Sequence, residues 1–177
     1  MRSLFAALVL FGTLICAPAS HASPFAAMEI TPLSEKIVAP AFTLAALDGS
    51  ESNLSDYKGK VMLLNFWATW CAPCLREMPG MENLSQKFRD DEFVVLGISN
   101  DQPRYKKRVA TFIKRLNLTF PVLLDADGKV SDDFSVAGIP VSFLIARDGT
   151  VLAHVVGERE WDSVEAFELI EYLLQQP

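Results

Sequence analysis

The chain has 177 residues, half of them hydrophobic, with 16 Lys and Arg against 22 Asp and Glu and a formal net charge of −6. This apolar content excludes a disordered protein over most of the length, and the acidic balance argues against a nucleic-acid-binding protein. The length fits a single domain with a sizeable core.

Residues 1–22 have the features of a cleavable signal peptide. Arg2 supplies the positive start, Leu4 to Ile15 forms an apolar core, and Ser20 and Ala22 are small residues of the kind found before a cleavage site. The core is shorter than the roughly 20 apolar residues that span a bilayer. We therefore expect an exported, periplasmic protein cleaved after Ala22, with membrane anchoring through an uncleaved leader as the alternative.

Beyond the leader, residues 23–38 have a weak pattern and are predicted to be an N-terminal tether, followed by one domain over residues 39–177. The domain begins with two short extended runs, Phe42 to Ala46 and Glu51 to Leu54. They flank Asp48-Gly49, a dipeptide typical of a hairpin turn. We expect an N-terminal β-hairpin here.

Strands and helices then alternate along the chain. Apolar runs predict strands at Val61–Trp67, Phe93–Ser99, Val122–Asp125, Val141–Ala146 and Thr150–Gly157. Helices are predicted at Ala72–Arg89, at Pro103–Leu116, which Pro103 starts, and at Trp161–Leu174, which is amphipathic, with a helical turn or short helix at Val130–Phe134. This order predicts an α/β fold, a central mixed sheet flanked by helices.

Two cysteines lie where the first buried strand meets its helix, in Trp70-Cys71-Ala72-Pro73-Cys74. Unpaired N–H groups at a helix N-terminus favour a thiolate at Cys71, and Cys74 follows one turn later within disulfide reach. They are the only cysteines after the leader, so in an oxidising compartment they indicate a redox pair. A structural zinc site lacks further ligands at suitable spacing. A structural disulfide would close too short a loop to stabilise much.

Glu77 is a candidate proton acceptor. It follows Cys74 by three residues, so the two side chains share the helix face that points toward the interior. Burial there would raise the pKa of the carboxyl, which could then take the proton of the Cys74 thiol. A solvated helix glutamate is the alternative interpretation.

Three segments of the chain together carry a family resemblance. They are Asn65-Phe66-Trp67-Ala68-Thr69-Trp70-Cys71-Ala72-Pro73-Cys74, Glu77-Met78-Pro79, and Gly138-Ile139-Pro140 followed by Phe143-Leu144-Ile145. In combination they resemble the thioredoxin fold and, more narrowly, the TlpA/ResA-like periplasmic thiol-disulfide oxidoreductases. The resemblance extends from about Ala39 to Leu174.

The resemblance implies catalytic roles. Cys71 would be the exposed nucleophile and Cys74 the resolving thiol, while Pro140 would follow a cis peptide bond and face the cysteines. Glu77 matches a buried acid of the narrower group. Asn65 stands where thioredoxin has a buried aspartate, which leaves Glu77 as the remaining proton acceptor.

Three further residues are assigned to binding or tuning. Trp70 would shield the disulfide and contact the partner, with core packing as the alternative. Pro73 would limit the flexibility of the turn. If the bond before Pro140 is cis, the Ile139 backbone is free to bond an extended client segment.

The residues between the cysteines favour a protein-disulfide reductase. Ala72-Pro73 includes no histidine that would stabilise the thiolate, which suggests a potential nearer the roughly −270 mV of thioredoxin than the roughly −120 mV of a strong oxidant. The alternatives are a disulfide oxidase or isomerase, and a Cu(I)-binding assembly factor for a respiratory oxidase. A peroxidase is disfavoured because Thr69 precedes Cys71 by two residues, not by the three of a Thr-x-x-Cys motif.

The resemblance also implies partners. Disulfide-bearing extracytoplasmic proteins would be the clients, and a membrane thiol-transfer reductase would donate electrons. The cytochrome c maturation branch usually has a glutamate after the cis-proline, where this chain has Val141, so apocytochrome c is a weaker client hypothesis. We expect a monomer with no cofactor, no metal and no nucleic-acid partner.

One basic cluster interrupts the acidic chain. It lies on the second predicted long helix and comprises Arg104, Lys106, Lys107 and Arg108, followed by Lys114 and Arg115. A solvated helix face and a docking patch for an acidic partner are both consistent with it.

Overall fold

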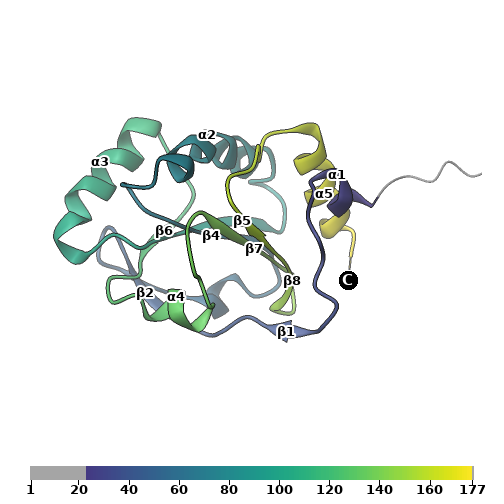
Figure 1. Cartoon of the computed structure of the whole chain (residues 1–177), viewed down its shortest axis with the longest axis horizontal. Coiled ribbons are helices and arrows are strands. Elements are labelled where there is room, and N and C mark those ends of the chain that lie inside the picture. The colour runs from purple at the N-terminus through teal and green to yellow at the C-terminus, as the bar shows by residue number, and fades with distance from the viewer. Residues whose placement is uncertain (1–22, 177) are drawn as a thin grey trace, which may run out of the picture.

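A computed structural model describes residues 23–176, and its centre is one eight-stranded mixed sheet in the order β1-β8-β7-β4-β5-β6-β2-β3 (Figure 1). The strands are β1 (Ile37–Val38), β2 (Thr43–Ala46), β3 (Glu51–Asn53), β4 (Val61–Trp67), β5 (Phe93–Ser99), β6 (Val122–Leu124), β7 (Val141–Ile145) and β8 (Thr150–Val156). The helices are α1 (Pro24–Ala27), α2 (Ala72–Lys87), α3 (Lys106–Leu116), α4 (Lys129–Asp133) and α5 (Val164–Leu174), with single 3-10 turns η1 (Leu54–Tyr57) and η2 (Pro103–Tyr105).

The central strand β4 is buried at every position because both faces of the sheet are covered. It runs parallel to β5 and antiparallel to β7, with Asn65 opposite Gly97 on one side and Ser142 on the other. Strand β5 is parallel to β6 as well. The predicted mixed sheet is confirmed, and its long apolar runs are the strands with neighbours on both sides.

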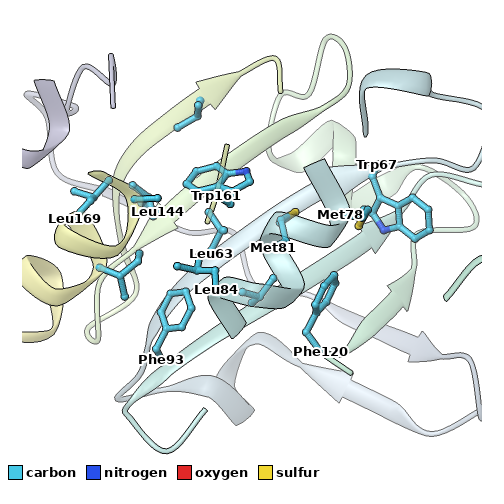
Figure 2. Close-up of a cluster of buried hydrophobic side chains, with 14 of the residues drawn as sticks. Leu63, Trp67, Met78, Met81, Leu84, Phe93, Phe120, Leu144, Trp161 and Leu169 are labelled. Carbon is cyan, nitrogen blue, oxygen red and sulfur yellow. The ribbon is translucent and has the colours of Figure 1, made fainter. Parts of the chain in front are cut away.

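Two hydrophobic layers lie on opposite faces of this sheet. In Figure 1, α2 and α3 lie above the sheet and α4 lies below it. The larger layer includes Leu63, Met81, Leu84, Trp161 and Leu169, which pack together in Figure 2. The smaller layer, around Phe66, Phe134 and Phe143, lies on the other face.

The predicted N-terminal hairpin is present. Strands β2 and β3 pair antiparallel, with Thr43 opposite Asn53, and the turn between them holds Gly49 at a φ of 92°. Strand β2 also pairs with β6, so the hairpin extends the central sheet at one edge.

Residues 23–38 differ from the predicted tether. They contain α1, which packs against α5, and β1, which pairs with β8 at the other edge of the sheet. Phe25, Met28 and Ile30 are buried in the larger core layer. These elements are too short to show a periodic pattern in the sequence, and tertiary contacts hold them.

Helix boundaries differ from the sequence expectations by a turn or less at most positions. The helix predicted from Pro103 begins as η2 and continues as α3. Helix α5 begins at Val164 rather than Trp161, because Ser163 caps it by accepting a hydrogen bond from the Ala166 N–H.

The predicted signal peptide, residues 1–22, lies outside the described residues. Within residues 23–176 no helix is both long enough and apolar enough to cross a membrane.

Candidate functional site

The turn from β4 into α2 places both cysteines at the N-terminus of α2. Cys71 is the N-cap residue, and its sulfur accepts a hydrogen bond from the Cys74 N–H at 3.3 Å. The two sulfurs form a disulfide, with 5.3 Å between the Cα atoms. A thiolate at Cys71 would therefore face unpaired N–H groups and the positive end of the helix.

The two cysteines differ in exposure by less than the sequence suggests. Cys71 is 5% exposed and Cys74 is 0% exposed. The expectation of an exposed Cys71 is therefore corrected: Cys71 is largely buried because it packs with the residues of the larger core layer. Trp70, which is 62% exposed, is the large apolar side chain next to it.

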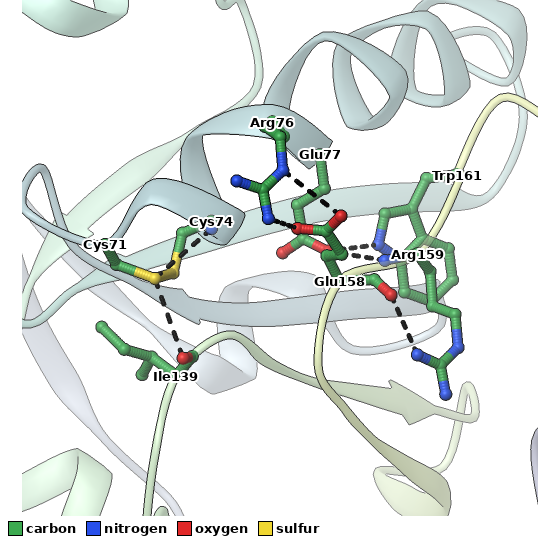
Figure 3. Close-up of polar contacts among 8 residues, drawn as sticks. All are labelled: Cys71, Cys74, Arg76, Glu77, Ile139, Glu158, Arg159 and Trp161. Carbon is green, nitrogen blue, oxygen red and sulfur yellow. Dashed lines mark hydrogen bonds and ion pairs between the residues drawn. A yellow bond between two sulfur atoms is a disulfide. The ribbon is translucent and has the colours of Figure 1, made fainter.

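The loop before β7 forms the other side of the disulfide. The Ile139–Pro140 peptide bond is cis, and the Ile139 carbonyl oxygen lies 3.7 Å from the Cys71 sulfur (Figure 3). The Ile139 N–H has no hydrogen-bond partner among the described residues. Backbone groups next to the disulfide are thus available to an extended peptide segment.

Glu77 is buried one turn beyond Cys74, with 4% of its surface exposed. Its Oε1 accepts a hydrogen bond from Asn65 Nδ2 at 2.8 Å. Its Oε2 accepts from the Arg159 N–H at 3.1 Å and from Trp161 Nε1 at 3.3 Å (Figure 3). The carboxyl is thus fixed by three donors between α2, β4 and the loop after β8.

Burial raises the pKa of Glu77 from its ordinary 4.5 to about 7, because desolvation penalises the charged carboxylate. Hydrogen bonds from Asn65, Arg159 and Trp161 oppose this shift, and the nearby charge of Glu158 adds slightly to it. Glu77 is therefore suited to exchange a proton near neutral pH.

Asn65 can serve Glu77 in both proton states. Its Nδ2 donates to Glu77 and also to Ser142 Oγ at 2.9 Å, while its Oδ1 is buried without a partner among the described residues. A protonated Glu77 has an O–H to donate, and rotation of the Asn65 amide would present Oδ1 to accept it.

A second buried acid, Asp101, was missed at the sequence level. It accepts hydrogen bonds from the Thr69 N–H at 2.8 Å and from Thr69 Oγ1 at 2.6 Å, and so holds the segment that leads into Cys71. The sequence does contain a signal for it: Asp101 follows the end of β5, and the parallel β4 ends at the same edge of the sheet, just before Thr69.

Trp161 and Arg159 were also missed as partners of Glu77. Both belong to the loop between β8 and α5, and no local pattern indicates that this loop returns to α2. In contrast, Pro73 and Pro140 lie at the turn positions expected for them, at the start of α2 and directly before β7.

The chemistry available here is thiol–disulfide exchange. The disulfide lies between the start of α2 and the Ile139 loop, with only Cys71 slightly exposed, and a buried acid lies one turn along the same helix. Among residues 23–176, no group of three or more His, Cys, Asp or Glu side chains is arranged to hold a metal ion.

Comparisons with known proteins agree with this chemistry. The AhpC/TSA family model matches residues 37–154. The chain is similar to the thiol-disulfide oxidoreductase ResA of Geobacillus kaustophilus, with 37% identity over 77% of this chain and 78% of the relative. ResA of Bacillus cereus is also 37% identical, over 73% of each chain.

A solved structure is similar as well. It is that of a putative thiol:disulfide interchange protein DsbE from Chlorobium tepidum, with a TM-score of 0.72 and 33% identity, covering 80% of this chain and 99% of the other. The thioredoxin-like fold expected from the sequence is therefore confirmed.

Proposed function

Because this chain belongs to the thioredoxin-like AhpC/TSA family and is a thiol-disulfide oxidoreductase of the ResA type, we propose that it acts as an exported protein-disulfide reductase. The observation that carries the proposal is the combination of a disulfide at a helix N-terminus with a buried acid one turn further along the same helix.

The reaction starts from the reduced protein. The Cys71 thiolate attacks one sulfur of a client disulfide, forming a mixed disulfide while the other client sulfur leaves as a thiolate. Cys74 then loses its proton and attacks the Cys71 sulfur, which releases the second client sulfur. Two electrons pass from the Cys71/Cys74 dithiol to the client, and the protein ends as the disulfide.

Glu77 is proposed to accept the proton of Cys74. Cys74 is fully buried, so its thiol has no direct exchange with water. Glu77 is on the same face of α2 and has a pKa raised to about 7 by desolvation, so it is partly ionised at neutral pH. It also borders a surface pocket of about 710 Å³ near Arg76 and Glu158, through which the proton can leave.

The surroundings of the sulfurs favour reduction of clients. A strong disulfide oxidant stabilises its reduced form through a strongly favoured thiolate. Here no Lys, Arg or His side chain of the described residues forms a hydrogen bond with either sulfur, and an ionised Glu77 would disfavour a thiolate at Cys74. The Cys71 thiolate is thus stabilised by the helix N-terminus without an added cation from the described residues, and the dithiol gives up its electrons more readily than that of a strong oxidant.

Export and partners are part of the same proposal. The signal-peptide features of residues 1–22 support a periplasmic location, with anchoring through the leader as the alternative. The clients would be disulfide-bearing extracytoplasmic proteins. A membrane thiol-transfer reductase would reduce the Cys71–Cys74 disulfide back to the dithiol after each turnover. Pro140 and Ile139 would bind an extended client segment, Trp70 would contact it, and Pro73 would restrict the turn between the cysteines.

A single-turnover assay tests the proposal. The reduced protein, freed of reductant, is mixed with a neutral peptide that contains one disulfide, and both are followed by mass spectrometry. We expect peptide dithiol and protein disulfide to form in equal amounts, and the Cys71→Ser variant to form neither. Rapid oxidation of the reduced peptide by the oxidised protein, without the reverse reaction, would support the oxidase alternative instead.

A further inference from the structure

One surface of the molecule has a charge opposite to that of the whole chain. No Asp or Glu occurs between Asp101 and Asp125, while this segment contains six of the chain's 16 Lys and Arg residues. All six are exposed on η2 and α3: Arg104, Lys106, Lys107, Arg108, Lys114 and Arg115.

These six charges are not neutralised by ion pairs. Among residues 23–176, salt bridges engage cations elsewhere, such as Lys36, Arg76 and Arg147, but none of the six on η2 and α3. The pKa of Asp48 is lowered chiefly by hydrogen bonds from Ser50 and only slightly by the charge of Lys106.

Part of this surface is hollowed next to the disulfide. A groove of about 420 Å³ lies between α3 and the start of α2 and is lined by Lys107, Arg108 and Arg115 on one side and by Thr69 and Leu75 on the other. Arg108 Nη2 donates to the Thr69 carbonyl at 3.2 Å. Thr69 and Leu75 flank the Cys71–Cys74 turn in sequence, so the groove borders the segments that lead into and out of the turn that carries the reacting sulfurs.

We propose that this basic groove, defined by Lys107, Arg108 and Arg115, binds an acidic segment next to the cystine of the client protein. The inference rests on the proposed reductase function and names the substrate class of that site. A carboxylate-rich segment complements the three unpaired cations, and its position would bring the client disulfide to Cys71.

The packing of α3 argues for a protein client over a membrane surface. The apolar side of α3 is buried, with Val109 at 0% and Phe112 at 7% exposure. A helix that binds the membrane interface inserts an exposed apolar face between lipids, and α3 has none to offer.

Exposed charges that are separated by water act mainly on the rate of association, and salt screens them.

Two peptides test the groove. They share one cystine loop and differ only in three flanking Glu or three flanking Lys residues. We expect the reduced protein to reduce the Glu peptide about tenfold faster than the Lys peptide at low ionic strength. The preference should vanish in 1 M NaCl, where charges are screened beyond about 3 Å.

Two double variants with the same change in net charge locate the effect. Lys107→Glu/Arg115→Glu should abolish or reverse the preference. Lys58→Glu/Lys60→Glu, at exposed positions just before β4 and thus at the opposite end of the sheet from the disulfide, should keep it. Both variants should reduce a neutral peptide at the wild-type rate.

The outcomes separate the two proposals. The proposed role of the groove would be refuted if the wild type reduced both peptides equally, or if both double variants lost the preference alike. Neither result would contradict the reductase function. Failure to reduce any peptide would overturn the reductase function and the groove with it. The wild-type protein could instead sediment with phosphatidylglycerol vesicles and show no preference between the peptides. If only Lys107→Glu/Arg115→Glu then abolished sedimentation, this face would be assigned to a membrane and the client proposal would be overturned.

Discussion

Replacing Glu77 by Gln should change how the stability of the protein depends on pH. The pKa of Glu77 is raised from 4.5 to about 7 in the folded protein, chiefly by desolvation. Between these values the folded state binds more protons than the unfolded state, so the free energy of unfolding falls as the pH rises. This difference between the two pKa values corresponds to a decrease of about 3 kcal/mol in the free energy of unfolding between acidic and slightly alkaline pH.

The Glu77→Gln variant should not show this pH-dependent decrease in the free energy of unfolding, because an amide does not titrate. The amide has a fixed cost of its own, since its NH₂ group must face one of the donors from Asn65, Arg159 and Trp161, but that cost does not depend on pH. Relative to the wild type, the variant should therefore gain about 3 kcal/mol in free energy of unfolding from pH 4 to pH 8.

Urea denaturation of the oxidised proteins at both pH values measures this difference, and the disulfide keeps the cysteines from titrating. Glu168→Gln, at an exposed position on α5, is the matched control and should show no such gain. A relative gain below about 1 kcal/mol for Glu77→Gln would mean that Glu77 titrates as an ordinary surface carboxylate, and its role as proton acceptor would then be refuted.

Three further predictions concern the neighbourhood of the disulfide. Cys71→Ser should abolish reduction of a peptide disulfide, whereas Cys74→Ser should accumulate a mixed disulfide with the peptide that mass spectrometry detects. If the mixed disulfide accumulated on Cys71→Ser instead, the roles of the two cysteines would be reversed. Trp70→Ala should slow peptide reduction several-fold yet change the free energy of unfolding by less than about 0.5 kcal/mol, because the side chain is 62% exposed; an unchanged rate would return Trp70 to a passive surface position. Asp101→Asn should cost about 1 to 3 kcal/mol in urea denaturation because it disturbs buried hydrogen bonds to Thr69, and an unaltered midpoint would contradict that.

Much of the fold could be predicted because its signals are local. The apolar runs that became β4 and β5 are buried along nearly their whole length, and the Asp48-Gly49 turn joins β2 to β3. The segment from Ser23 to Val38 was predicted as a tether because α1 and β1 span only four and two residues. Elements of that length are held by contacts with α5 and β8 and leave no periodic pattern.

The site divides in the same way. The cysteines, Glu77 and Pro140 stand in short motifs, and the structure brings the Ile139–Pro140 loop to the disulfide. Trp161, which fixes Glu77, comes from a loop 84 residues further along the chain, and its position depends on how β8 and α5 pack. Such contacts follow from the tertiary fold and have no signature in the local sequence.

The reduction potential of the Cys71/Cys74 pair distinguishes a reductase from an oxidase. The oxidised and reduced proteins are equilibrated with thiol–disulfide buffers of known potential, and the thiol content is read by alkylation and mass spectrometry. For a reductase we expect a potential near the roughly −270 mV of thioredoxin, at which the dithiol reduces client disulfides. A potential near the roughly −120 mV of DsbA would contradict it and make the protein an oxidant.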